Sequence, residues 1–161
     1  MGIEIERKFL VVDDSWRAQA GSSKRMQQAY LSKGAERSIR VRISDNEAYL
    51  NIKSSRDGIR RLEYEYAIPV EEAVELIDQV ALKPSIDKTR YYIRQGKHTW
   101  EIDEFYGDNA GLVIAEIELD DESEHFDKPD WLGAEVSSDP RYYNMNLISH
   151  PFSQWEDSSV S

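Results

Sequence analysis

The first residues that could do chemistry lie at the N-terminus, in Glu4-Ile5-Glu6-Arg7-Lys8. Charged and apolar residues alternate here, which predicts a strand with Glu4, Glu6 and Lys8 on one face. Two carboxylates on one face repel each other, so a sheet has little reason to place them together. A divalent cation such as Mg²⁺ would supply that reason, and Lys8 could then contact an anion bound to the metal. A solvated, charged sheet face is the alternative explanation of this stretch.

Same-sign pairs two positions apart recur in the later predicted strands. The acidic pairs are Glu4/Glu6, Glu63/Glu65, Glu101/Asp103 and Glu116/Glu118; the basic pairs are Arg40/Arg42 and Lys88/Arg90; Lys8, Lys53 and Arg61 add further cations. The opposite strand faces hold Ile, Val, Leu and Tyr. A closed antiparallel barrel turns one face inward, and a charged lumen would suit a metal-bound polyanion, with carboxylates on the metal and Arg or Lys on phosphate oxygens.

The elements that would position these residues follow from periodicity and turn signals. Strands are predicted at 2–10, 26–31, 38–43, 47–54, 61–68, 85–94, 99–105 and 112–119. Helices are predicted in a short segment that ends at Gly21, at 71–81, at 120–126 and at 139–149. The pattern shows neither a repeat nor a linker, so we expect one domain over 1–152 and a flexible tail over 153–161.

Composition narrows the classes of function. The chain has 161 residues, a formal net charge of −11 and no cysteine, which excludes disulfides, thiolate zinc sites and a thiol nucleophile. An acidic surface disfavours nucleic-acid and membrane binding, both of which need basic patches. No apolar run approaches the ~20 residues that span a bilayer, and no secretory signal is present, so we expect a cytoplasmic protein.

The chain resembles the CYTH superfamily, the triphosphate tunnel metalloenzymes, whose mark is an N-terminal ExExK strand. The matching segments, in order, are Glu4-Ile5-Glu6-Arg7-Lys8, Gln28-Ala29-Tyr30-Leu31, Ile39-Arg40-Val41-Arg42, Ile52-Lys53-Ser54, Arg61-Leu62-Glu63-Tyr64-Glu65, Asp87-Lys88-Thr89-Arg90-Tyr91, Glu101-Ile102-Asp103, Ala115-Glu116-Ile117-Glu118, Trp131-Leu132-Gly133 and Asp139-Pro140-Arg141-Tyr142. The chain is most similar to the short bacterial members that hydrolyse inorganic tripolyphosphate. The resemblance implies a mainly β (α+β) fold: a closed eight-stranded antiparallel β-barrel around a hydrophilic tunnel, with helices packed outside.

The resemblance also implies roles for the charged residues. Metal ligands, for Mg²⁺ or Mn²⁺, would be Glu4, Glu6 and Glu118, helped by Asp103 and Glu116. Phosphate ligands would be Lys8, Arg40, Arg42, Lys53, Arg61, Lys88 and Arg90. Glu63, Glu65 and Glu101 would be further tunnel acids. The implied reaction is hydrolysis of the terminal phosphoanhydride of tripolyphosphate, with organic triphosphates as further substrates.

Several alternatives stay open at this level. The attacking water could be bound to the metal and oriented by Glu6 or Glu63, or it could be deprotonated by Lys88, with Tyr30 hydrogen-bonded to that lysine. The same fold could carry a class IV adenylate cyclase or a thiamine triphosphatase, and a non-catalytic polyphosphate- or nucleotide-binding module is a rival of another class. Arg141 and Tyr142 could cap the lumen or pack at its edge. The oligomeric state is undetermined.

Overall fold

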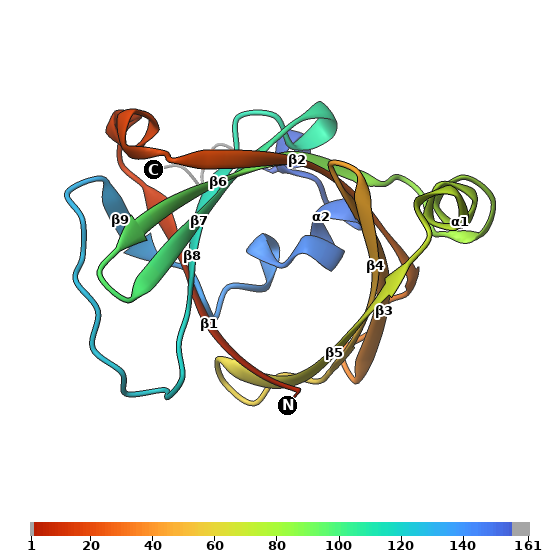
Figure 1. Cartoon of the computed structure of the whole chain (residues 1–161), viewed down its shortest axis with the longest axis horizontal. Helices are drawn as coiled ribbons and strands as arrows, with labels where there is room; N and C mark the ends of the chain where they lie inside the picture. The colour runs from red at the N-terminus through yellow and green to blue at the C-terminus, as the bar shows by residue number, and fades with distance from the viewer. Residues whose placement is uncertain (1, 156–161) are drawn as a thin grey trace.

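Eight antiparallel strands close into a barrel in the computed structural model, which describes residues 2–155 (Figure 1). The strands are β1 (Ile3–Val11), β2 (Ser22–Ser32), β3 (Arg37–Ser44), β4 (Glu47–Ser54), β5 (Arg60–Ile68), β6 (Ile86–Gln95), β7 (His98–Phe105) and β8 (Val113–Glu118). Their order around the barrel is β5-β4-β3-β2-β6-β7-β8-β1, and pairing of β5 with β1 completes the circle. The predicted eight-stranded barrel is confirmed.

One edge of β1 is shared between two partners. Its N-terminal part pairs with β5, where Ile3 lies opposite Leu62, and its C-terminal part pairs with a ninth strand, β9 (Leu132–Glu135). The sequence pattern did not predict β9. A Cβ on Gly133 would lie 3.0 Å from the carbonyl oxygen of Leu10, so this close approach of β9 to β1 favours glycine.

The strand register turns the charged faces into the barrel. Lys8 lies opposite Glu116 across β1 and β8, and Lys53 lies opposite Glu63 across β4 and β5. Directly opposite residues point to the same face of a sheet, so these pairs extend one charged surface around the lumen. The apolar residues between them consequently point outward and need cover.

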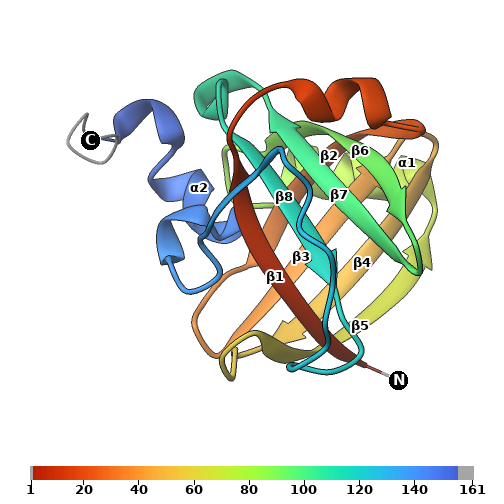
Figure 2. The same cartoon turned by 90° about the vertical axis from the view of Figure 1, so that its left-hand side faces the viewer.

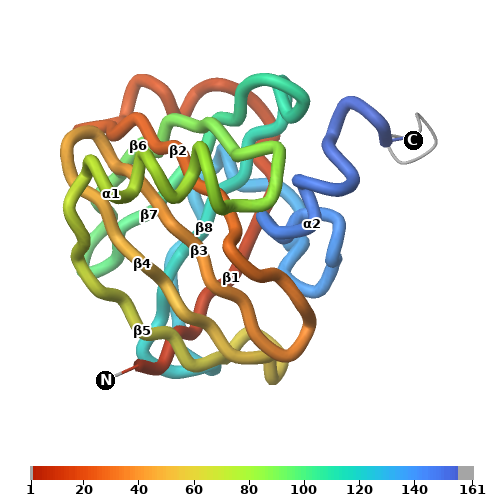
Figure 3. Tube along the Cα trace, turned by 90° about the vertical axis from the view of Figure 1, so that its right-hand side faces the viewer, coloured from red at the N-terminus to blue at the C-terminus, as the bar shows by residue number. Residues whose placement is uncertain are grey.

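Helices, turns and β9 provide most of that cover. On one side, Trp16, Trp100 and Trp131 pack together outside the sheet, with Trp16 on the 3₁₀ turn Ser15–Gln19. On another, α1 (Val70–Glu75) packs on β3 and β4, and the π-helical turn Leu76–Val80 that continues it packs on β2 (Figure 3). These two segments form most of the helix predicted at 71–81. No helix among residues 2–155 has both the length and the apolar character to span a membrane.

The predicted helix at 120–126 was wrong. Residues 119–130 form an irregular loop, in which the Glu124 carboxylate accepts a hydrogen bond from the Asp120 backbone N–H (2.7 Å) and approaches His98 Nε2 at 2.5 Å. Glu124 thereby binds groups that are not part of a helix, and the Phe126 ring packs against the rings of Phe9 and Trp100. Side-chain to backbone bonds of this kind compete with helix formation.

One end of the barrel is closed by the C-terminal segment, which consists of the 3₁₀ turn Pro140–Tyr142 and helix α2 (Asn144–Ser149) (Figure 2). Leu147 and Ile148 of α2 pack with Phe105 and Ile114 of the barrel. A further 3₁₀ turn, Phe152–Gln154, leads to Trp155, whose ring lies 5.0 Å from that of Tyr142. The predicted start of a flexible tail at 153 falls inside this packed segment, and residues 156–161 of that tail lie outside the described residues.

Candidate active site

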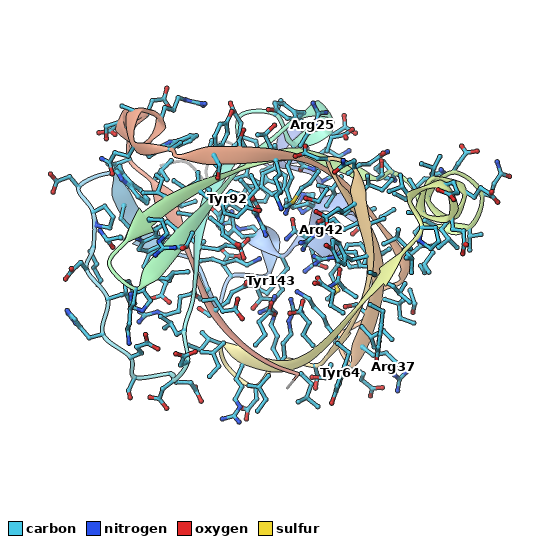
Figure 4. The ribbon with its side chains drawn as sticks, viewed as in Figure 1. Arg25, Arg37, Arg42, Tyr64, Tyr92 and Tyr143 are labelled. Atoms are coloured by element: carbon cyan, nitrogen blue, oxygen red, sulfur yellow. The ribbon has the colours of Figure 1, made fainter. Side chains whose placement is uncertain are left out.

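A cavity of about 270 Å³ occupies the barrel interior. All but two of the sequence-predicted site residues line this cavity. They are Glu4, Glu6, Lys8, Tyr30, Arg40, Arg42, Lys53, Arg61, Glu63, Glu65, Arg90, Glu101, Glu116 and Glu118. Figure 4 shows Arg42 inside the ring of strands. The fold therefore brings side chains from β1, β2, β3, β4, β5, β6, β7 and β8 around one space.

The two exceptions, Lys88 and Asp103, lie behind the cavity wall and are fully buried. Lys88 Nζ donates to Asp103 Oδ2 at 2.8 Å, and Arg90 binds the same carboxylate through Nε (2.7 Å) and Nη2 (2.9 Å). Burial raises the pKa of Asp103, but Arg90 and Lys88 outweigh it and hold that pKa below its usual range. Asp103 has both oxygens occupied by cations, so in this arrangement it acts as a counter-ion and not as the expected metal ligand.

Lys88 also differs from its expected position. Burial lowers the pKa of Lys88 to about 7, against the opposing effect of Asp103. The expected hydrogen bond to Tyr30 is not formed: the described partner of Lys88 Nζ is Asp103, and Tyr30 instead lines the cavity. Lys88 thus binds Asp103 and is not among the residues that line the cavity, and its role in phosphate binding or proton transfer stays a prediction.

Glu4 is a paired acid at the seam between β1 and β5. Arg61 Nε donates to Glu4 Oε1 at 3.0 Å, and Lys53 Nζ lies 3.4 Å from Glu4 Oε2 and 3.3 Å from Glu63 Oε2. Burial alone would raise the pKa of Glu4, but Lys53 and Arg61 lower it to about 2. Glu4 is therefore ionised and partly neutralised before any ligand binds.

Glu6 and Glu118 lie opposite each other on β1 and β8, and neither forms an ion pair with a cation among residues 2–155. Burial and the neighbouring carboxylates of Glu116 and Glu4 raise the pKa of Glu6 to about 8. Burial, Glu4 and Glu101 raise the pKa of Glu118 to about 7. At neutral pH Glu6 is mostly protonated and Glu118 is about half protonated, and both would release protons to a cation.

Arg40, Arg42 and Lys8 are the corresponding unpaired cations. In the part of the chain that the structure describes, Nε and Nη2 of Arg40 and Nε of Arg42 are buried without a hydrogen-bond partner. Burial and the neighbouring Arg40 lower the pKa of Arg42 to about 10. Lys8 Nζ has only a long contact, 3.5 Å, to the Tyr142 carbonyl oxygen. Buried donors without acceptors are costly, so this wall is built to receive an anion.

The acids suit a divalent cation in their chemistry, although their side chains do not converge. Within residues 2–155, no three carboxylates or imidazoles are grouped closely enough to hold a metal by themselves. Mg²⁺ is commonly bound through one or two carboxylates together with substrate phosphates and water. Glu6 and Glu118, supported by Glu4 and Glu116, offer such a partial ligand set.

The cavity wall also contains five residues outside the predicted site set: Ser38, Arg56, Tyr143, Asn144 and Met145. Arg56 is on the loop between β4 and β5, and the last three begin the segment that closes the barrel. Tyr143, at the centre of Figure 4, is the inward residue of that segment. Tyr142 instead packs in the apolar cluster with Trp155, and Arg141 is ion-paired with Asp139 at 2.8 Å. Same-face spacing gives no information about loop residues, so strand periodicity alone could not distinguish Tyr143 from Tyr142.

Comparison with known proteins fits this geometry. The CYTH domain model matches residues 2–143. The chain belongs to the CYTH family. The match includes every predicted site residue, from Glu4 to Glu118, but ends at Tyr143 and so excludes α2.

Curated relatives and a solved structure extend the comparison across the CYTH chain. The inorganic triphosphatase of Acetivibrio thermocellus is 47% identical over 157 residues, which cover 98% of this chain and 100% of the relative. That of Nitrosomonas europaea is 33% identical, covering 89% and 95% of the two chains. A crystal structure described as an inorganic triphosphatase superposes with a TM-score of 0.62 at 30% identity, over 90% of this chain and 93% of the other.

Proposed function

We propose that this chain is an inorganic triphosphatase that hydrolyses the terminal phosphoanhydride of tripolyphosphate and requires Mg²⁺ or Mn²⁺. The observation that carries the proposal is one cavity in which the unpaired cations Arg40, Arg42 and Lys8 share the lumen with the unpaired acids Glu6 and Glu118. Relatives described as inorganic triphosphatases support it. We place the enzyme in the cytoplasm, acting on a small-molecule substrate without a nucleic-acid or membrane partner.

The cationic wall would bind and orient the phosphate chain. Arg40 and Arg42 project planar guanidinium groups from neighbouring inward positions of β3, and each can bind phosphate oxygens through two parallel N–H groups. Lys8, Lys53, Arg61 and Arg90 add charge from four other strands. Fixed donors that are already dehydrated stabilise developing negative charge without first reorganising. The cavity volume of about 270 Å³ lies below the roughly 300–1,000 Å³ typical of sites for drug-sized ligands.

The acidic wall would hold the cation. Glu6 and Glu118 would be its first ligands, with Glu4 and Glu116 beside them. Repulsion by neighbouring carboxylates raises the pKa of Glu6 and of Glu118, and a bound cation would relieve that repulsion. When bound, the cation would neutralise phosphate oxygens and lower the pKa of water. Glu6 and Glu63 line the same cavity and can accept hydrogen bonds from a water aligned with the phosphoanhydride.

Activation of water by Lys88 is the competing mechanism. Its pKa of about 7 suits a general base, but its ammonium group donates to Asp103 behind the cavity wall. The geometry therefore favours water oriented by carboxylates, with Lys88 bound to Asp103 and Tyr30 facing the cavity. Lys88→Met should lower kcat and leave the shape of the kcat–pH profile unchanged. A flattened alkaline limb in Lys88→Met would instead identify Lys88 as the base, and Tyr30→Phe would test its partner.

A phosphate-release panel tests the proposal. Tripolyphosphate, ATP and thiamine triphosphate are each incubated with the chain, with Mg²⁺, Mn²⁺ or EDTA, and cyclic AMP is assayed alongside. We expect tripolyphosphate to exceed ATP in kcat/KM by at least about tenfold, and EDTA to abolish release. Preference for ATP with accumulation of cyclic AMP would identify a cyclase, and preference for thiamine triphosphate would identify a thiamine triphosphatase. Binding of all three without turnover would identify a non-catalytic module.

A further inference from the structure

Arg56 is a cavity cation that lies on a loop and not on a strand. Its guanidinium carbon lies 4.2 Å from the centre of the Tyr143 ring, and both side chains line the cavity. Lys8 Nζ lies over the same ring at 5.6 Å. Arg61, by contrast, is held by Glu4 at 3.0 Å, whereas Arg56 forms no ion pair with a carboxylate among residues 2–155. Arg56 can therefore bind an anion by leaving an aromatic ring, without breaking a salt bridge.

The backbone on both sides of Arg56 is fixed. Asp57 and Arg60 exchange backbone hydrogen bonds of 2.7 and 3.1 Å around Gly58, which adopts a φ of 64°. On the other side of Arg56, Ser54 Oγ accepts a hydrogen bond from the Leu62 backbone N–H at 2.9 Å. The guanidinium group can thus move between the ring and an anion in the cavity by side-chain rotation alone.

An open hollow of about 710 Å³ lies next to the cavity at this point. Arg56, Arg61 and Tyr143 line both spaces, as do Ser38 and Met145. The cavity itself is small, so a bulky group attached to one end of a bound triphosphate needs space outside it. The hollow provides that space, and Arg56 lies at the boundary between the two.

We infer that Arg56 is a specificity-determining residue that favours inorganic tripolyphosphate over organic triphosphates. This inference rests on the proposed function. Both end phosphates of tripolyphosphate are free, whereas in an organic triphosphate one end is esterified and carries one ionisable oxygen fewer. Arg56 binds the free end phosphate at the boundary with the hollow through two N–H groups. In an organic substrate whose ester group lies in the hollow, that group replaces one of the three terminal oxygens of this phosphate and removes its negative charge. Binding of the organic substrate is therefore stabilised less by Arg56.

The test compares Arg56→Gln with wild type in the full chain, using tripolyphosphate and ATP as substrates with Mg²⁺. We expect kcat/KM for tripolyphosphate to fall about tenfold and that for ATP to change less than about twofold. Arg60→Gln is the matched control, because Arg60 is an exposed cation of the same hairpin that does not line the cavity. The control should keep the wild-type ratio, and both variants should keep the wild-type Tm. Equal losses on both substrates, or an unchanged ratio, would overturn the inference.

Binding separates this inference from the proposed function. Calorimetric titration of tripolyphosphate and of ATP into the same three proteins, without added metal, gives the ratio of their affinities. If Arg56→Gln prefers tripolyphosphate over ATP less than wild type does, and wild type shows no hydrolysis, the role of Arg56 is supported and the hydrolase proposal is contradicted. An unchanged affinity ratio would overturn the role of Arg56, whether or not wild type hydrolyses tripolyphosphate.

Discussion

Two groups of charged residues in the barrel interior differ in how they are neutralised. In the buried cluster Lys88–Arg90–Asp103, hydrogen bonds of 2.7 to 2.9 Å join each cation to the carboxylate. In the cavity wall, Glu6 and Glu118 have raised pKa values, while Nε and Nη2 of Arg40 and Nε of Arg42 have no hydrogen-bond partner among residues 2–155. The charges of the first group are paired within the protein, and those of the second group are paired only when a ligand binds. A charged lumen by itself does not define a site; the unpaired part of it does.

The largest effect should follow from breaking the complete group. Asp103→Asn leaves Lys88 buried without its carboxylate partner and leaves Arg90 with Glu101 (3.1 Å) and Glu116 (3.7 Å) alone. Breaking a buried pair by removing one partner costs about 3–5 kcal/mol. For a chain of this size each kcal/mol changes the Tm by about 2–4 °C, so thermal unfolding should show a clear loss. Glu101→Gln is the control, because Glu101 pairs with Arg90 at 3.1 Å but is 36% exposed. If the two variants lost stability equally, the buried cluster would not be the structural unit described here.

The second effect concerns catalysis without loss of stability. Arg42→Gln should lower kcat on tripolyphosphate by about 10²–10³, the typical effect of removing one preorganised donor. The Tm of the metal-free protein should stay the same or rise, because a buried charge without a partner has been removed. Arg37→Gln on the same strand is the control, since its side chain is 72% exposed and, among residues 2–155, forms an ion pair with Glu36 alone. A Tm loss in Arg42→Gln as large as that of Asp103→Asn would contradict the division into two groups.

The smallest effect is on the pH dependence of stability. The pKa of Glu6 is about 8 in the folded protein, above its ordinary value, so between these values the folded state binds more protons than the unfolded state. The metal-free wild type should therefore lose stability as pH rises toward 8. Glu6→Gln resembles the protonated form, so its Tm should exceed that of wild type at pH 8 by more than it does at pH 5. Parallel Tm–pH curves of wild type and Glu6→Gln in EDTA would show that the neighbours of Glu6 do not raise its pKa.

The sequence predicted the barrel and most of the site because charge and strand period coincide. Glu4, Glu6 and Lys8 alternate with apolar residues, so their common face follows from the spacing alone. Strand alternation predicts the face to which a side chain points but not whether that side chain lines the cavity. Lys88 and Arg90 share a face, yet of the two only Arg90 lines the cavity. Arg56 and Tyr143 lie outside any strand, so their inward position depends on a turn and on packing that alternation does not encode.

The most direct test of the central claim is a crystal structure of the chain with tripolyphosphate and Mn²⁺, using anomalous scattering to locate the metal. The account predicts a peak at bonding distance from the carboxylates of Glu6 and Glu118, with phosphate oxygens against Arg40 and Arg42. Asp103 should keep its bonds to Lys88 and Arg90. A metal bound to Asp103, with Lys88 released into the cavity, would contradict the account.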